Sequence, residues 1–317
     1  MTQTIELAAQ VPDELAGKRL DHIAAKLFAD YSRSRIQSWI KSGELTVEGE
    51  IRKAKEKLVG GEAILVKAEL VEDESWEPQP LNLDILYEDD ALLVLNKPQG
   101  LVVHPAAGHR DNTLLNALLH HCPSLAALPR AGIVHRIDKD TTGLLVVAKS
   151  LPAHASLVEQ LQAKTVYREY EAIACGVMTG GGKVDEPIGR HPTQRTKQAV
   201  HHAGKDAVTH YRVIERFRAH THIRVQLETG RTHQIRVHMA HIGYPLLGDQ
   251  VYGGRLRLPK GASQDLIDAL RGFRRQALHA RTLGLQHPLS GETMEWSCEL
   301  PEDMQQLLHI LSTDSRL

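Results

Sequence analysis

The first 68 residues show the hydrophobic spacing of two helices followed by two short strands. The first helix is predicted from apolar residues three and four positions apart: Leu20, Ile23, Ala24, Leu27 and Phe28. The second helix is predicted to begin after Ser32, a residue type that caps helix N-termini, and to end at Gly43. Strand-like runs follow at residues 45–47 and 63–66. Together these elements predict a small α+β domain.

Beyond residue 80 the chain is dominated by alternating apolar and polar positions, which is the period of β-strands. In the clearest run, His222, Arg224, Gln226 and Glu228 alternate with Thr221, Ile223, Val225 and Leu227. Further strands are predicted at 91–95, 144–148, 166–174 and 208–214. A helix is predicted from Thr232, as its N-cap, to Gly243. The pattern predicts one large, mostly antiparallel mixed sheet with flanking helices, in the α+β class.

An acidic stretch separates the two patterned regions. Nine acidic residues and no lysine or arginine occur from Glu69 to Asp90. The first part of this stretch has no periodicity and ends at Pro78 and Pro80, which is typical of a linker. The predicted organisation is therefore a domain at 1–68, a linker at 69–80 and a second domain at 81–317.

The 317-residue chain has a formal net charge of -1, so any attraction to nucleic acid depends on where its charges lie. Ten lysines and arginines stand against three acidic residues between positions 190 and 240. This segment could face phosphates, although a solvated basic surface explains it equally well from charge alone. Other basic candidates lie on the second predicted helix and in a loop rich in glycine and proline: Arg33, Arg35, Lys41, Arg255 and Arg257.

The hydrophobic content of 42% is enough for a large core, and no segment is suited to a membrane. A membrane helix needs roughly 18 consecutive apolar residues, and no run approaches that length. We therefore expect a cytoplasmic protein without a membrane partner. No coiled coil or apolar stripe demands a partner chain, so a monomer is expected.

The most informative segment for chemistry is "GIVHRIDKDTTGLLVVAK", from Gly132 to Lys149, in which an apolar run enters a polar turn and leaves as a strand. A turn between strands can hold a reactive carboxylate such as Asp138 rigidly and still expose it. Taken alone, however, Asp, Lys, Thr and Gly are also ordinary turn residues. A calcium loop is disfavoured because Lys149 stands where the bidentate Glu belongs, and the order of residues does not fit a phosphoryl-transfer loop.

Two further segments carry candidate site residues. Arg231 precedes the helix that is predicted after the strand at 221–228, and Tyr170 lies on the strand at 166–174. The tyrosine is either part of the core or the wall of a pocket against which a flat ring stacks, and spacing does not decide between them. His238 and His241 form an H-x-x-H pair without a third ligand at a recognisable spacing, so no metal site is expected.

These segments, in this order, resemble the RluA family of pseudouridine synthases. The family's motifs are represented by "EDDALLVLNKPQGLVVHP", "GIVHRIDKDTTGLLVVAK", "REYEA" and "TGRTHQIRVHMAHIGYPLLGDQVYG". The first domain resembles an S4-type RNA-binding domain through "KRLDHIAAKLF", "SRSRIQSWIKSGELTVEG" and "VGGEAILV". With both domains included, the resemblance covers essentially the whole chain.

The resemblance implies a role for four residues of the second domain. Asp138 would be the catalytic aspartate, and Arg136 would help to hold a flipped-out nucleotide. Tyr170 would stack against the target base, and Arg231 would pair with the aspartate. The substrate implied is 23S ribosomal RNA, free or in an assembling large subunit, with several uridines of the helix 69 stem-loop as targets and a contribution to ribosome biogenesis.

The chemistry of this reaction is consistent with one carboxylate and no cofactor. Pseudouridine forms when the bond from uracil N1 to C1′ breaks and the base rejoins through C5, with no redox change. Asp138 could attack C1′, attack C6 or remove a proton from C2′, and the sequence leaves these routes open. Two other classes remain as alternatives: a non-catalytic ribosome-binding or RNA-chaperone protein, and a nucleoside or glycoside hydrolase with a second acid in its pocket.

Overall fold

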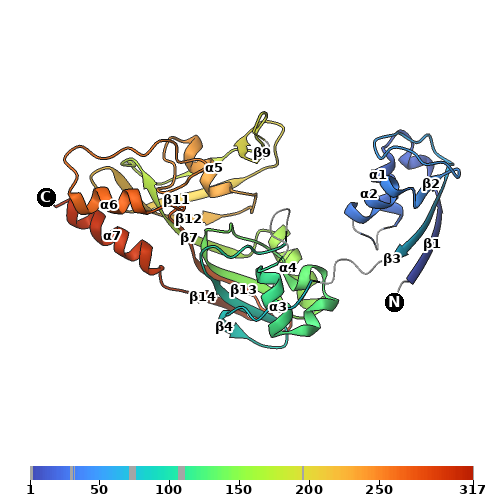
Figure 1. Cartoon of the computed structure of the whole chain (residues 1–317), viewed down its shortest axis with the longest axis horizontal. Coiled ribbons are helices and arrows are strands. Elements are labelled where there is room, and N and C mark those ends of the chain that lie inside the picture. Colours follow the sequence, from blue (N-terminus) through green and yellow to red (C-terminus); the bar gives the residue numbers. More distant parts are fainter. Residues whose placement is uncertain are drawn as a thin grey trace. The chain divides into compact units, whose positions relative to one another are not determined.

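The structure, a computed structural model, divides the chain into two compact units, Met1–Ser75 and Trp76–Leu317, and each is described by itself (Figure 1). The described residues are 3–28, 31, 33–70, 76–105, 111–194 and 196–316. Within these ranges no helix is both long enough and apolar enough to cross a membrane.

The N-terminal unit is a three-stranded antiparallel sheet with two helices. Its elements are β1 (Gln3–Gln10), η1 (Asp13–Leu15), α1 (Leu20–Leu27), α2 (Arg33–Ser42), β2 (Leu45–Val47) and β3 (Ala63–Leu70). The order of strands is β1-β3-β2, so the central strand is the last in sequence. The predicted helices and strands are present, whereas β1 was not predicted. β3 continues to Leu70, two residues into the predicted linker, and the predicted cap Ser32 lies outside the described residues.

The core of this unit forms where the two helices cover one face of the sheet. Ile23 of α1 and Ile36 and Trp39 of α2 are almost fully buried, together with Ile64 of β3. Asp21 is buried among them, and the Arg19 guanidinium donates to both of its carboxylate oxygens at 3.0 and 2.9 Å. The amphipathic spacing seen in the sequence is therefore the spacing of this core.

The larger unit is built on a nine-stranded mixed sheet. Eight strands follow the order β4-β5-β6-β13-β7-β12-β11-β8, and β14 pairs with β13. All pairings are antiparallel except that of β6 with β13. The strands are β4 (Asp84–Glu88), β5 (Leu92–Lys97), β6 (Thr142–Ala148), β7 (Tyr167–Cys175), β8 (Gly182–Asp185), β11 (Val208–Arg216), β12 (His220–Leu227), β13 (Leu278–Gln286) and β14 (Thr293–Ser297). The predicted α+β class with a mostly antiparallel mixed sheet is confirmed.

Helices cover both faces of this sheet, so its central strands are apolar on both sides. The helices are α3 (Leu114–His121), α4 (Leu151–Gln162), α5 (Gln234–His241), α6 (Gln264–Gly272) and α7 (Glu302–Asp314), with short turns η2 (Pro123–Ala127) and η3 (Pro129–Gly132). Leu145 of β6 faces a cluster that includes α3, whereas Leu144 faces a cluster that includes α4. α6 and α7 pack on each other in a third cluster with Ile173 of β7. A separate two-stranded sheet joins β9 (Ile188–Arg190) to β10 (Gln198–Val200).

The start of β6 lies unusually close to β13, and a glycine makes this possible. Gly143 has a φ of 111°, and a Cβ built on it would lie 2.2 Å from the carbonyl oxygen of Ala280. No other residue fits here without backbone movement. Beside it, the Thr142 hydroxyl is within 2.8 Å of the Nδ1 of His279. The turn that precedes β6 is thereby anchored at one end.

Candidate active site

Asp138 lies in the turn that leads into β6, and backbone hydrogen bonds hold this turn. The amide of Thr141 donates to the carbonyl of Asp138 at 3.0 Å. The fully buried Lys97 ammonium donates to three carbonyl oxygens, those of Pro98, Leu101 and Lys139, at 2.7, 3.0 and 2.8 Å. Burial lowers the pKa of Lys97 to about 7, against the effect of the neighbouring carboxylates. Lys97 thus ties the end of β5 to the residue after Asp138.

A pocket opens at Asp138, and its lining comes from four parts of the chain. The turn before β6, strand β7 and the segment from the end of β12 into α5 supply most of it, and the first residue of β13 adds one side chain. The lining residues are Arg136, Ile137, Asp138, Thr141, Arg168, Tyr170, Leu227, Gly230, Arg231, Thr232, His233, Gln234, Ile235, Arg236 and Leu278. All four residues predicted to form the site, Asp138, Arg136, Tyr170 and Arg231, are therefore brought together.

The arginine that pairs with Asp138 is Arg236, not Arg231. Arg236 Nη1 donates to Asp138 Oδ2 at 2.9 Å, from a side chain that is 7% exposed. The Nε of Arg231 instead donates to the carbonyl oxygen of Asp206 at 3.0 Å, although its side chain still lines the pocket. The predicted pairing was wrong because Arg231 lies before the helix. Arg236 lies in its first turn, on the side that faces the aspartate.

A second carboxylate holds the guanidinium of Arg236 in place. Asp249, whose side chain is fully buried, accepts from Arg236 Nε at 2.7 Å and from Nη2 at 2.9 Å. Its Oδ1 also accepts from the amides of Val251 and Tyr252. Burial opposes the charge of Asp249, but the hydrogen bonds and the charge of Arg236 hold the pKa of this carboxyl below its usual range. These contacts raise the pKa of Arg236 even though the side chain is buried.

The second oxygen of Asp138 faces a histidine. The hydroxyl of Tyr252 accepts from the amide of Gln198 at 2.9 Å and is 2.7 Å from the Nδ1 of His233. If the hydroxyl donates to Nδ1, the proton of the neutral imidazole lies on Nε2. That Nε2 is 3.9 Å from Asp138 Oδ1. Burial lowers the pKa of His233, with Asp138 acting in the opposite direction.

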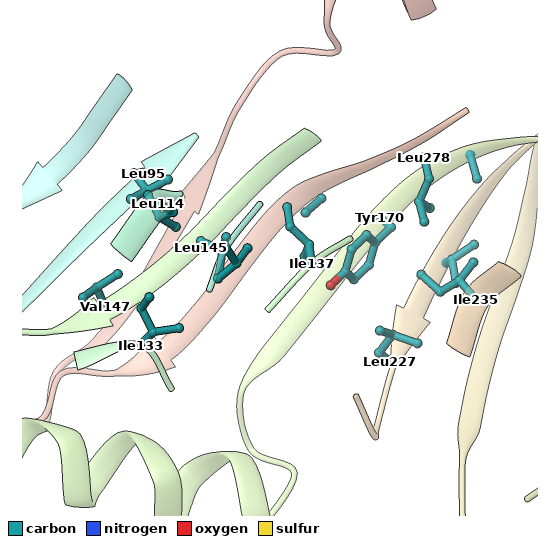
Figure 2. Close-up of a cluster of buried hydrophobic side chains, with 14 of the residues drawn as sticks. Leu95, Leu114, Ile133, Ile137, Leu145, Val147, Tyr170, Leu227, Ile235 and Leu278 are labelled. Carbon is teal, nitrogen blue, oxygen red and sulfur yellow. The ribbon is translucent and has the colours of Figure 1, made fainter. Parts of the chain in front are cut away.

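Tyr170 and four apolar side chains form the wall of the pocket. Figure 2 shows Tyr170 beside Ile137, Leu227, Ile235 and Leu278. The tyrosine is 6% exposed, and burial raises the pKa of its hydroxyl. It is therefore both a core residue and a pocket wall, the two roles that the sequence left open. A wall of this kind excludes water from one side of the carboxylate.

The structure corrects the predicted start of α5. His233, not Thr232, occupies the N-cap position, with a φ of 58°, and its side chain makes no capping hydrogen bond. The Oε1 of Gln234 instead accepts from the amide of Arg231 at 3.0 Å and from the Thr229 hydroxyl at 2.7 Å. This glutamine closes the turn from within the helix.

The remaining predicted residues lie outside the pocket or at its rim. Arg136 is exposed and lines the pocket, whereas Arg255 and Arg257 are exposed in the loop before α6. Arg35 and Lys41 lie on α2, where Lys41 is exposed; the side chain of Arg33 lies outside the described part. No group of three His, Cys, Asp or Glu side chains suitable for a metal ion occurs among the described residues.

Arg236 and Asp249 were missed by sequence reasoning although both lie within a segment that it selected. In "TGRTHQIRVHMAHIGYPLLGDQVYG" the two residues are 13 positions apart and have no local periodicity in common. The signal that could have found them is helical periodicity, because Arg236 occupies an inward-facing position of the predicted helix. A buried arginine on such a face needs a carboxylate partner, and Asp249 is the nearest acid that follows it in sequence.

Comparison with known proteins agrees with the motifs. A family profile described as RNA pseudouridylate synthase matches residues 91–241, and an S4 domain profile matches residues 18–64. The chain is 60% identical to ribosomal large subunit pseudouridine synthase D of Yersinia pestis over 316 residues, covering 99% of this chain and 97% of that protein. It is 58% identical to the protein of the same name in Escherichia coli (strain K12) over 315 residues, with coverage of 99% and 97%.

Solved structures share the fold of the larger unit. Human RNA pseudouridylate synthase domain containing 4 has a TM-score of 0.58 and 29% identity, and the match covers 72% of this chain and 92% of that one. Human RNA pseudouridylate synthase domain containing 1 has a TM-score of 0.54 and 23% identity, with coverage of 74% and 96%, and supports the fold alone.

Proposed function

The chain belongs to the family of ribosomal large subunit pseudouridine synthases D, and we propose that it isomerises uridine to pseudouridine in the RNA of the large ribosomal subunit. The identity to these relatives confirms the resemblance to this type of synthase. As a pseudouridine synthase the protein is an isomerase. The alternatives of a non-catalytic RNA-binding protein and of a hydrolase are set aside, because neither belongs to this family.

The observation that carries the proposed mechanism is the asymmetric environment of the Asp138 carboxylate. Arg236 holds Oδ2, while Oδ1 accepts no hydrogen bond from the described residues and its ion-pair contact, His233 Nε2, is 3.9 Å away. Oδ1 is thus the oxygen that is available to a substrate. Whether it acts as a nucleophile at carbon or as a proton acceptor, each route begins with contact between this oxygen and the nucleotide.

The target uridine must leave its stack to reach Asp138, which costs on the order of a few kcal/mol and costs least in a loop. In our proposal the base stacks on Tyr170, and Arg136 at the pocket rim holds the flipped nucleotide. A stem-loop fits this requirement, and we propose several uridines of helix 69 in 23S ribosomal RNA as the targets. Their modification would contribute to ribosome biogenesis.

Other basic residues would bind the surrounding RNA. The S4 unit carries Arg33, Arg35 and Lys41 on α2, and the larger unit carries Arg255 and Arg257 in an exposed loop. Each phosphate contact adds affinity that depends on salt but not on sequence. Arg231 extends this set to the mouth of the pocket.

The test is to map pseudouridines in 23S ribosomal RNA from cells with and without the gene, complemented by variants. We expect sites to disappear in the deletion strain, to return with the wild-type protein, and to stay absent with Asp138→Asn. Asp140→Asn is the matched control, since Asp140 lies in the same turn but does not line the pocket, and it should restore the sites. The proposal is wrong if no site changes in the deletion strain or if Asp138→Asn restores them.

A further inference from the structure

Arg168 is a buried arginine that has no counter-ion in the part of the chain that the structure describes. It lies on β7 and is 7% exposed, yet its guanidinium makes one hydrogen bond among the described residues, from Nη2 to the carbonyl oxygen of Glu228 at 3.2 Å. Its Nε is buried and has no partner, and no carboxylate of the described chain forms an ion pair with it. By contrast, the buried Arg236 and Arg275 both pair with a carboxylate through two nitrogens.

Arg168 lines the active-site pocket, and its guanidinium lies beside Gly230 of the same lining. Arg168 and Tyr170 are two residues apart on β7, so their side chains lie on the same face of the sheet, and both line the pocket with Asp138. Gly230 leaves room for the arginine, because a Cβ at that position would lie 2.9 Å from Nη1. The charge is therefore placed beside the ring on which we propose that the base stacks.

An unpaired buried charge is costly, so its presence needs an explanation. Burial lowers the pKa of the Arg168 guanidinium, but at neutral pH an arginine keeps its proton. Residues kept at such a cost are common where a ligand supplies the missing partner. A partner for Arg168 must be an anion or a carbonyl group that gains negative charge.

Resting on the function proposed above, we propose that Arg168 donates hydrogen bonds to a carbonyl oxygen of the flipped uracil and stabilises the negative charge that the base gains during the reaction. When the N1–C1′ bond breaks, its electron pair stays on the base and is shared with O2 and O4. A bond then forms between C5 and C1′, C5 loses its proton and N1 gains one, so no other reactant is needed. Guanidinium donors at such a position favour the charged intermediate.

The symmetry of the base makes one fixed donor sufficient for the whole reaction. To present C5 in place of N1, the ring turns about the axis through N3 and C6. The same rotation exchanges O2 with O4, so a carbonyl oxygen occupies the same place before and after. An arginine held by β7 could therefore contact the substrate base and the product base without moving. Cytosine has an amino group in place of O4 and would not offer this equivalence.

The experiment compares Arg168→Met with the wild-type protein on two transcripts of the 23S stem-loop, one with uridine and one with 5-fluorouridine throughout. Single-turnover disappearance of each nucleoside is measured with enzyme in excess. We expect the variant to lose about 10²- to 10³-fold in rate on uridine. The loss on 5-fluorouridine should be at least roughly ten-fold smaller, because the fluorine itself stabilises a base anion and so replaces part of what Arg168 supplies.

Stability provides an independent measurement. Arg168→Met removes a buried charge that has no partner, so its unfolding temperature should be equal to or above that of the wild-type protein. The matched control is Arg281→Met on the neighbouring β13, where the arginine has ion pairs to Glu171 and Glu299 at 3.6 and 3.2 Å. This control should leave the rate on both transcripts unchanged.

Three results would overturn the inference. Arg168→Met could retain the wild-type rate, could unfold several degrees below the wild-type protein, or could lose the same factor on both transcripts together with RNA affinity. The last result would mean that Arg168 binds a phosphate instead of the base. If the wild-type protein made no pseudouridine either in the uridine transcript or in large ribosomal subunits from the deletion strain, the proposed function itself would fail, which is a separate outcome.

Discussion

Replacing Arg236 by alanine should damage both the stability of the larger unit and its activity, for reasons that can be separated. The substitution removes the partner of Asp138 and also leaves Asp249 buried without its guanidinium. In this variant Oδ1 of Asp249 still accepts from the amides of Val251 and Tyr252. Its Oδ2, however, no longer accepts a hydrogen bond from the Nε of Arg236.

The expected loss of stability follows from this isolated charge. Removing one partner of a buried ion pair typically costs about 3–5 kcal/mol, because the other partner stays desolvated. The side chain of Asp249 is 0% exposed and that of Arg236 is 7% exposed, so the full range applies. For a unit of this size each kcal/mol lowers the melting temperature by roughly 2–4 °C, which gives a total decrease of about 6–20 °C.

Calorimetry of the full chain measures this decrease, and single-turnover pseudouridine formation measures the activity. The informative control is the double variant Arg236→Ala/Asp249→Asn, in which the asparagine is neutral and still offers an oxygen to the two amides. We expect it to recover most of the lost stability but none of the activity, since Asp138 still has no arginine. If the double variant is no more stable than Arg236→Ala, the buried charge is not the cause of the instability and this reasoning is refuted.

Three further predictions follow from the same contacts. The pKa of Asp249 is lowered on folding, so its contribution to the free energy of unfolding is present above the unfolded pKa of about 3.9 and is lost as pH falls through the folded pKa. Acid titration of the unfolding free energy should show this loss in the wild-type protein and not in Arg236→Ala/Asp249→Asn. Gly143→Ala should lower the free energy of unfolding, measured by chemical denaturation, by roughly 3 kcal/mol or more, because the added Cβ would overlap the carbonyl of Ala280. A near-neutral effect would mean that β6 and β13 can move apart at little cost in free energy. Arg231→Ala should weaken RNA binding by less than about ten-fold, measured by filter binding at two salt concentrations, with little change in the single-turnover rate; a rate loss as large as that of Arg236→Ala would return Arg231 to the role first predicted for it.

Local patterns were sufficient to predict seven of the fourteen strands in the described part of the chain and the helices of the smaller unit. The alternation at 221–228 corresponds to β12, in which Ile223 and Val225 are fully buried and Arg224 is exposed. The helical spacing of Leu20 to Phe28 corresponds to α1. Such patterns record which face of an element is buried, and that is decided by adjacent residues in the sequence.

What could not be predicted depends on contacts between distant segments. β1 is half exposed and acquires its pairing only from β3, some 60 positions later. The partner of Asp138 is 98 residues away, and the choice between Arg231 and Arg236 depends on where a turn ends and a helix begins. His233 shows how small this difference is, because its positive φ moves the helix start by one residue relative to the predicted cap. Arg168 is a further case. The alternation along the strand predicts which face carries Arg168, but not that no carboxylate of the described residues pairs with it.

The pairing of β6 with β13 also determines when the enzyme can begin to work as it is being synthesised. Thr142 and His279 are 137 residues apart, and the turn that carries Asp138 is anchored by this contact. A nascent chain that has emerged only as far as α5 holds Asp138 and Arg236 but has no β13 beside Gly143. Its apolar β6 would then be paired on one edge only. We therefore expect the active site to assemble late in translation, so that an unfinished chain on the ribosome is exposed to misfolding before it is able to modify RNA.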